Sequence, residues 1–227
     1  MIGSFLAIID LQIKRILPYL VFNAAPVSGP KPRTDKDMTT QNTTQTAPTV
    51  TNGVNVSALY ETIDAVKQTP QIADFQFRAA NRWMGGDRNR STIHGFHGAC
   101  GDHAHGNGPF VIDNAEPPVL LGEGAAANPV EYVLHALAGC LTTTMVYHAA
   151  ARGIEVESAR SELQGDLDLK GFLGLDDSVR KGFSTVRVTM QVKSDADVET
   201  LKSLTQFSPV YDIVSKSLPV EVTVEKM

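Results

Sequence analysis

The sequence predicts an α+β fold in which antiparallel sheets wrap around one long central helix. Three observations lead to this prediction. A long apolar helical segment covers residues 128–152, a strand, turn and strand surround Gly85-Gly86, and alternating strands follow at 156–169 and 183–193. Hairpins stand where a parallel sheet would need crossover helices, so an alternating α/β class is not predicted.

The composition of the chain argues against several classes of function. The chain has 227 residues and a formal net charge of −5, from 20 Lys and Arg against 25 Asp and Glu, so no nucleic-acid partner is expected. Hydrophobic residues make up 42% of the chain, which is typical of a globular protein with a buried core. The two cysteines cannot form the disulfide framework of a small secreted protein, and a cytoplasmic location is therefore expected.

The amino-terminal part is expected to lie outside the folded domain. Residues 1–55 comprise an apolar leader and a tail rich in Pro, Thr, Gln and Asn, which cannot bury enough apolar surface to order itself. The leader contains Asp10, Lys14 and Arg15, so no membrane span is expected. A start at Met38 would keep every later element, and residues 1–37 are expected to be dispensable.

The α+β domain is expected over residues 56–227, with a short amphipathic helix at 57–68 and a core at 75–227. A hairpin is predicted over residues 75–97, because the Gly85-Gly86-Asp87 turn supplies positive φ angles between two extended segments. The glycine-rich stretch 98–108 is predicted to be a loop.

The central helix has clear boundary signals. Asn128 is a good N-cap, Pro129 suits the first helical position, Glu131 completes an Asn-x-x-Glu capping pattern, and Gly153 ends the helix. About 24 residues at 1.5 Å per residue give a length of about 36 Å. The segment is apolar around most of its circumference, so we expect an obligate homodimer that buries it.

Short elements complete the domain. A helix is expected from Ser194, with apolar residues three positions apart. Ser208-Pro209 is expected to open another short helix that ends near residue 215. The alternating segment 219–227 is predicted to be a strand.

Cys140, in the central helix, is the candidate for chemistry. A cysteine acts as a nucleophile in its thiolate form, and the helical neighbours of Cys140 include no base. His135 and His148 point in other directions around the helix, so an arginine from another element would have to stabilise a thiolate. The alternative is that Cys140 is a buried thiol that acts as a small hydrophobic residue.

Several motifs resemble a known family. The stretch NPVEYVLHALAGC, preceded by PPVLLGEG and followed by Gly-Ile-x-Val and Gly-Asp-Leu-Asp-Leu strands, is similar to the osmotically inducible protein C and organic hydroperoxide resistance family (OsmC/Ohr) over residues 75–227. The resemblance implies an intertwined homodimer with two central helices. It also implies reduction of organic hydroperoxides by a reactive cysteine, which a second cysteine near the carboxyl end then captures.

The resemblance carries over to some residues and not to others. Cys140 matches the peroxide-attacking cysteine, whereas Ser208 stands where the family has its second cysteine, which suggests an OsmC-like subgroup without that cysteine. A serine cannot resolve a sulfenic acid, but it is a better helix N-cap than a cysteine. The family's active-site glutamate position is Val130 here, and Glu131 follows it as a candidate that a capping box would also explain.

The resemblance also implies an arginine just after the Gly-Gly turn. Arg88 and Arg90 both follow that turn, and either could stabilise the Cys140 thiolate. The alternative is that both are solvated surface residues.

A histidine-rich stretch raises a different possibility. His94, His97, Cys100, His103 and His105 occur close together, but their spacing matches no standard zinc site and the stretch is rich in glycine. We therefore expect no metal and no other cofactor, and a solvated polar loop instead. Cys100 could also serve as a substitute resolving thiol if that loop folds over the helix.

Two functions from different classes follow. The first is a thiol-dependent peroxidase that uses Cys140 on an organic hydroperoxide, with an external thiol reductant and with Arg88, Arg90 and Glu131 as candidate site residues. The second is a noncatalytic member of the fold that binds a small apolar ligand, with Cys140 as core packing.

Overall fold

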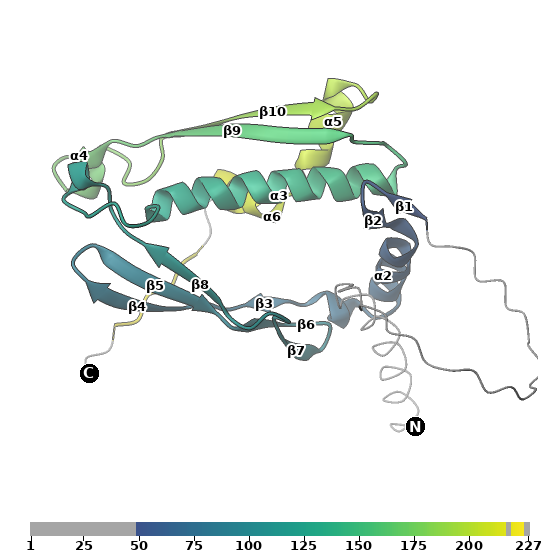
Figure 1. Ribbon diagram of the computed structural model, residues 1–227, viewed down its shortest axis with the longest axis horizontal. Helices are drawn as coiled ribbons and strands as arrows, with labels where there is room; N and C mark the ends of the chain where they lie inside the picture. Colours follow the sequence, from purple (N-terminus) through teal and green to yellow (C-terminus); the bar gives the residue numbers. More distant parts are fainter. Residues whose placement is uncertain (1–48, 217–218, 225–227) are drawn as a thin grey trace, which may run out of the picture. The chain divides into compact units, whose positions relative to one another are not determined.

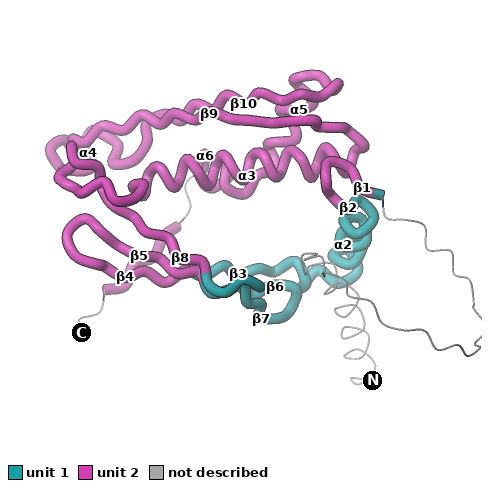
Figure 2. Tube along the Cα trace, in the orientation of Figure 1, with its two compact units in different colours: residues 1–49, 55–78, 94–109 teal, residues 50–54, 79–93, 110–227 magenta. Residues whose placement is uncertain are grey.

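The computed structural model describes residues 49–216 and 219–224 (Figure 1). These residues form two compact units, which Figure 2 distinguishes by colour. Unit 1 contains residues 55–78 and 94–109, and unit 2 contains residues 50–54, 79–93 and the chain from residue 110 onward. Within the described residues no helix is long and apolar enough to cross a membrane.

Unit 1 begins with an amphipathic helix, α2 (Val56–Gln68), followed by a short 3-10 turn, η1 (Pro70–Ala73). The helix prediction is confirmed, but the cap lies earlier than expected. The side chain of Asn55 accepts a hydrogen bond from the backbone N–H of Ala58 at 3.0 Å, which satisfies one of the free amides at the start of α2.

A three-stranded antiparallel sheet completes unit 1. It consists of β3 (Gln76–Phe77), β6 (Gly95–Gly98) and β7 (Gly101–Ala104), in the order β3-β6-β7. The predicted loop over residues 98–108 is therefore wrong in its first part. Ala99 and Cys100 adopt positive φ angles of 46° and 61°, and such a two-residue turn matches the twist of a hairpin. Glycine content alone does not distinguish a tight hairpin from a loop.

The first sheet of unit 2 is the predicted hairpin with one further strand. β4 (Ala80–Gly85), β5 (Arg88–Ile93) and β8 (Phe110–Asn114) pair antiparallel in the order β4-β5-β8. Gly85 and Gly86 have φ angles of 103° and 57°, so the turn uses the conformation that glycine allows. The hairpin prediction is confirmed, although two separate sheets share the region 75–97. The connection after β8 includes a 3-10 turn, η2 (Pro118–Leu120).

The central helix is α3 (Pro129–Ala151). Its start has the predicted capping box: Glu131 N–H donates to Asn128 Oδ1 at 2.9 Å, and Asn128 N–H donates to Glu131 Oε2 at 2.9 Å. Gly153 follows with a φ of 67°, which is the usual way for a helix to end. The predicted boundaries of the helix are confirmed.

One side of α3 is covered by the elements that follow it (Figure 1). The long strands β9 (Ser158–Asp166) and β10 (Thr185–Lys193) form an antiparallel hairpin in which Thr185 pairs with Asp166 and Lys193 with Ser158. The helices α5 (Val198–Thr205) and α6 (Pro209–Ser215) also pack on α3. The core of this unit contains Met145, Ala149, Leu201 and Leu204.

Two element boundaries differ from the prediction because of local caps. The strand after α3 ends at Asp166, since Asp168 caps the short helix α4 (Leu169–Phe172). The next helix begins at Val198 and not at Ser194, since the Asp197 side chain accepts from Thr200 N–H at 2.8 Å. Ser208 caps α6 as predicted.

The predicted strand at 219–227 is not present in its described part. Residues 219–224 have no assigned strand, and the side chains of Val220, Val222 and Val224 are exposed. The alternating pattern fits a strand, but a strand also needs hydrogen-bond partners, and among the described residues no strand pairs with this segment.

The folded part also starts earlier than residue 56. β1 (Val50–Thr51) and β2 (Val54–Asn55) form a small hairpin within the segment that the sequence assigns to the tail. Asn52 in its turn donates from Nδ2 to the carbonyl of Ile154 at 2.9 Å and accepts from Val156 N–H at 2.9 Å. The prediction for residues 1–48, including dispensability of 1–37, lies outside the described residues.

These contacts give a stability prediction for the Asn52 turn. Asn52 has a φ of 53°, so Asn52→Gly keeps the backbone conformation and removes both hydrogen bonds to the segment after α3. At about 1 kcal/mol per bond we expect a loss of about 2 kcal/mol. In a chain of this size that lowers the melting temperature by about 4–8 °C. Thermal unfolding followed by circular dichroism measures it, with the exposed Asn107→Gly as control. An unchanged melting temperature would show that the turn is not docked.

Candidate functional site

Cys140 lies near the middle of α3, at the border between a buried and an exposed face. Leu137, Leu141 and Met145 form the buried stripe of the helix, at spacings of four residues. Cys140 itself is half-buried and is a free thiol. Its thiol forms no hydrogen bond with any described residue. The thiol is therefore accessible from one side of the helix and packed on the other.

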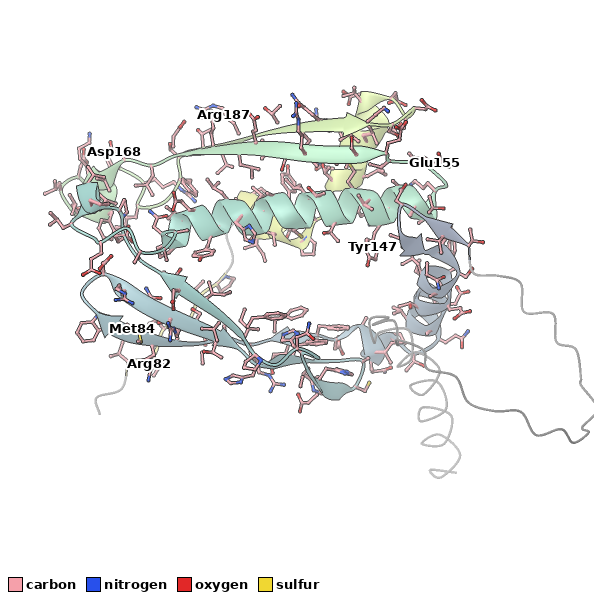
Figure 3. The ribbon with its side chains drawn as sticks, viewed as in Figure 1. Arg82, Met84, Tyr147, Glu155, Asp168 and Arg187 are labelled. Atoms are coloured by element: carbon pink, nitrogen blue, oxygen red, sulfur yellow. The ribbon has the colours of Figure 1, made fainter. Side chains whose placement is uncertain are left out.

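The exposed face of α3 is mainly apolar and includes Cys140 about midway along its length. Val133, Ala136, Thr143 and Tyr147 are exposed and follow one another at spacings that place them in one stripe with Cys140. In Figure 3 the side chain of Tyr147 projects from the side of α3 opposite to β9 and β10. We refer to these five residues as the α3 stripe. The expectation that other elements enclose the helix is thus met on one side only.

The two candidate arginines lie on β5, and one of them is paired. Arg90 Nε donates to Asp113 Oδ1 at 2.6 Å, and Nη2 donates to Oδ2 at 2.9 Å. These hydrogen bonds hold the pKa of Asp113 below its usual range, and the charges of Arg90 and Arg88 lower it further. The side chain of Arg88 forms no hydrogen bond or ion pair with the described residues, but its charge also contributes to the lowered pKa of Asp87.

Asp113 is also bound to α3. The hydroxyl of Tyr132, in the first turn of α3, donates to the backbone carbonyl of Asp113 at 2.9 Å. Arg90 on β5, Asp113 on β8 and the start of α3 are therefore joined by one continuous set of hydrogen bonds.

A second acid fixes the connection between β8 and α3. Asp87, in the β4-β5 turn, accepts from Glu116 N–H at 2.8 Å and from Glu123 N–H at 3.3 Å through Oδ2. The Glu116 bond is the main reason that the pKa of Asp87 is lowered. Gly122 is required here, because a Cβ at this position would lie 2.0 Å from the Glu116 carbonyl oxygen.

The arginines line a small pocket of about 40 Å³. Its lining consists of Met84, Arg88, Asn89, Arg90, Asp113, Asn114, Ala115, Ala125 and Ala126. Cys140 is not part of this lining, and no hydrogen bond joins it to Arg88 or Arg90 in the described chain. The structure thus brings the two arginines together with Asp113, while their pairing with Cys140 stays a prediction. Met84, on β4, is labelled in Figure 3.

Glu131 and Ser208 have clear structural roles. The Glu131 carboxylate accepts from the backbone N–H of Asn128, which is the capping box and not a free catalytic position. Ser208 is only 1% exposed, and its Oγ accepts from Tyr211 N–H at 3.2 Å. A catalytic role for Glu131 stays a prediction, and Ser208 supplies a cap where the implied family pattern has a thiol.

The histidine-rich stretch forms no metal site in the described part of the chain, where no three His, Cys, Asp or Glu side chains come together as ligands. His97 Nδ1 lies 3.3 Å from Asp102 Oδ1, and His103 Nε2 lies 3.0 Å from the Gly98 carbonyl oxygen. Contacts within the β6-β7 hairpin therefore account for the positions of these two histidines. Cys100 is exposed in the β6-β7 turn.

Sequence reasoning did not identify Asp113, Tyr132 and Asp87 as members of this region. The register that places Asp113 opposite Arg90 is a property of the β5-β8 pairing. The sequence shows an acid in a strand after an arginine-bearing hairpin, but this is only weak evidence for an ion pair, since the two strands could pair in several registers.

A second cluster, the His148 group, consists of His148, Arg152 and Phe207 and lies at the carboxyl end of α3. The rings of His148 and Phe207 stack with centroids 4.3 Å apart, and Arg152 lies 5.9 Å from the Phe207 ring centroid. Arg152 Nη1 lies 3.2 Å from His148 Nδ1, and because arginine can only donate, Nδ1 is the acceptor and is unprotonated. Burial, and then the charge of Arg152, lowers the pKa of His148.

A family model described as OsmC-like protein matches residues 122–225, which confirms the resemblance for that part of the chain. No curated protein sequence matches the chain significantly.

Several solved structures match part of the chain. An OsmC-like protein from Mycoplasma pneumoniae is 12% identical, with a TM-score of 0.47 over 63% of this chain and 89% of that chain. An OsmC-like protein of unknown function from Vibrio cholerae is 15% identical, with a TM-score of 0.46 over 64% and 95%. An organic hydroperoxide resistance protein OsmC from Legionella pneumophila is 17% identical, with a TM-score of 0.41 over 61% and 89%.

The His148 group gives a prediction for pH dependence. Its pKa is lower in the folded state than the value of about 6.5 in an unfolded chain, so the unfolded state takes up a proton first as the pH falls. We expect the free energy of unfolding to decrease from about pH 6.5 down to the folded-state pKa of His148. Urea unfolding at a series of pH values measures this, and His148→Gln should flatten the slope. The exposed His135→Gln is the control. Equal slopes in wild type and His148→Gln would contradict the prediction.

Proposed function

We propose, from the membership of residues 122–225 in the OsmC-like protein family, that this chain reduces organic hydroperoxides through the thiol of Cys140. The observation that carries the proposal is the position of Cys140 in the central helix, half-buried and in the middle of the apolar α3 stripe. A small apolar peroxide can approach a thiol in that position.

The reaction balances with a single protein thiol. The Cys140 thiolate attacks an oxygen of the hydroperoxide, an S–O bond forms, and the O–O bond breaks. The organic part leaves as an alcohol after it takes up a proton, and the sulfur becomes a sulfenic acid, oxidised by two electrons. The peroxide is reduced by the same two electrons.

Regeneration requires thiols from outside the chain. Ser208 has no sulfur, so it cannot condense with the sulfenic acid of Cys140. One external thiol condenses with it to a mixed disulfide and releases water, and a second thiol then restores Cys140 and leaves as the external disulfide. The arginines on β5 are proposed to stabilise the thiolate, with Glu131 as a secondary candidate. A reducing cytoplasm would provide suitable thiols.

A homodimer is proposed as the working state. The α3 stripe exposes Val133 at 39% and Tyr147 at 49% of their surface, which is unusual for the central helix of a domain. A second copy that covers this face would complete the enclosure of α3. It would also desolvate the surroundings of Cys140, which strengthens any charge interaction with the thiolate.

One observation favours a second function. Cys140 has no hydrogen-bond partner among the described residues, and the rest of the α3 stripe is mainly apolar. A noncatalytic protein that binds a small apolar ligand at this face would need only such packing. Reactivity of the thiol distinguishes this alternative from the peroxidase.

The peroxidase proposal predicts thiol oxidation at one residue. On addition of cumene hydroperoxide we expect rapid loss of the Cys140 thiol in wild type and in Cys100→Ser, and only background loss in Cys140→Ser. A dimedone-type probe should trap the sulfenic acid on Cys140, because no second thiol captures it. Excess peroxide should carry it on to sulfinic acid. Mass spectrometry identifies the products. If Cys140 reacts no faster than Cys100, the noncatalytic function is favoured.

The dimer proposal predicts the mass in solution. Light scattering at micromolar concentration should give about twice the chain mass of 24.5 kDa, and a stable interface of this kind buries about 2,000 Å² or more. Ala136→Glu places a charge in the α3 stripe, and glutamate is a good helix former, so α3 itself should remain folded. Burial of that charge would disfavour the dimer, and the measured mass should therefore shift toward that of one chain. Thr189→Glu, on the exposed side of β10, is the matched control. A folded wild-type monomer would contradict the proposal.

A further inference from the structure

Three consecutive threonines follow Cys140 and Leu141 in the middle of α3, at positions 142–144. Threonine is a poorer helix former than alanine, which this helix also has at exposed and half-buried positions. An exposed threonine in the middle of a helix therefore costs some stability relative to alanine. Its hydroxyl calls for an explanation other than helix formation.

The helix does not use the hydroxyl of Thr143. A helical threonine commonly donates its hydroxyl proton to a carbonyl one turn earlier, as Thr62 does in α2, where Oγ1 donates to the Ala58 carbonyl at 2.9 Å. The Thr143 hydroxyl makes no such bond and has no hydrogen-bond partner among the described residues. The side chain is exposed, so this donor is available to a molecule that approaches α3.

Thr143 and Cys140 lie next to each other on the surface of α3. They are three residues apart, so their side chains are about 60° apart around the helix and their Cβ atoms about 5–6 Å apart. Side chains of a helix tilt toward its amino terminus, so Thr143 leans over the turn that contains Cys140, whereas Ala136 leans away from it. Tyr147, one turn further along the α3 stripe, projects away from β9 and β10 in Figure 3. The thiol and the hydroxyl therefore share the face from which a peroxide can approach.

We propose that Thr143 is a catalytic hydrogen-bond donor: its hydroxyl binds the peroxide oxygen that leaves with the organic group when the Cys140 thiolate attacks the other oxygen. The inference rests on the proposed function, because it assigns a second group to the same reaction. A hydroxyl suits this role, since it donates a hydrogen bond without adding a charge that a homodimer would have to bury.

The step balances without a change of protonation at Thr143. The S–O bond forms as the O–O bond breaks, and negative charge moves from the sulfur to the departing oxygen. The hydrogen bond from Thr143 strengthens as that charge develops, so it stabilises the transition state more than the bound peroxide. Water then protonates the alkoxide, and the alcohol leaves.

The experiment compares two reagents in the full chain carrying Cys100→Ser, in which Cys140 is the remaining thiol. Thr143→Val removes the hydroxyl and keeps the branched shape, and we expect the rate constant of Cys140 oxidation by cumene hydroperoxide to fall about tenfold. Alkylation by iodoacetamide should keep its rate, because iodide is a weak base and gains little from a hydrogen bond. Thr143→Ser keeps a hydroxyl and should retain most of the peroxide rate.

A change of leaving group tests the role of the donor directly. Peracetic acid releases a carboxylate, which is a much weaker base than an alkoxide, so the defect of Thr143→Val should nearly disappear with this reagent. A defect of the same size with cumene hydroperoxide and with peracetic acid would overturn the proposal.

Thr142→Val is the matched control, because Thr142 has the same side chain on the same helix but lies about 160° from Cys140. It should leave both rates unchanged. The proposal is also overturned if Thr143→Val oxidises as fast as wild type, or if it loses as much rate with iodoacetamide as with the peroxide. If iodoacetamide alkylates wild-type Cys140 but the hydroperoxide does not oxidise it, the peroxidase is rejected together with the donor. A reactive wild type with an unchanged Thr143→Val rejects the donor alone.

Discussion

The burial of one stripe of α3 against the β9-β10 hairpin and α5 is the constraint on which the rest of unit 2 depends. Met145 and Ala149 are almost fully enclosed there by Leu201, Leu204 and the inner faces of the strands. Close packing on this side fixes the rotation of α3 about its axis. The rotation in turn decides that Cys140 lies at the border of the packed face and that the α3 stripe remains uncovered.

Polar contacts at the start of α3 place the charged groups around this helix. The capping box between Asn128 and Glu131 fixes where the helix begins, and Tyr132 then reaches the backbone of β8. Asp113 lies on that strand and binds Arg90, so the start of α3 is connected through β8 to a charged group of β5.

Ser208 stands where the implied family pattern has a second thiol, and it connects the fold with the proposed function. A serine oxygen accepts the amide of Tyr211 and is buried with that bond satisfied, so α6 begins in a stable manner on α3. The same atom cannot resolve an oxidised sulfur. The proposed peroxidase would therefore combine a well-capped helix with a dependence on external thiols for turnover.

The sequence by itself determined the elements whose signals are local. The capping pattern around Asn128, the glycine turn at Gly85-Gly86 and the Ser208-Pro209 helix start act within a few residues, and the motif around Cys140 identified the family that residues 122–225 match. Only the tertiary structure decided how distant segments pair. The β5-β8 register joins Arg90 to Asp113, and the Asn52 turn docks beside Ile154. Residues 219–224 alternate correctly, yet no strand in the described part of the chain pairs with them. Strand register and docking depend on long-range packing, which many alternating sequences satisfy equally well, and for that reason these contacts could not be read from the chain alone.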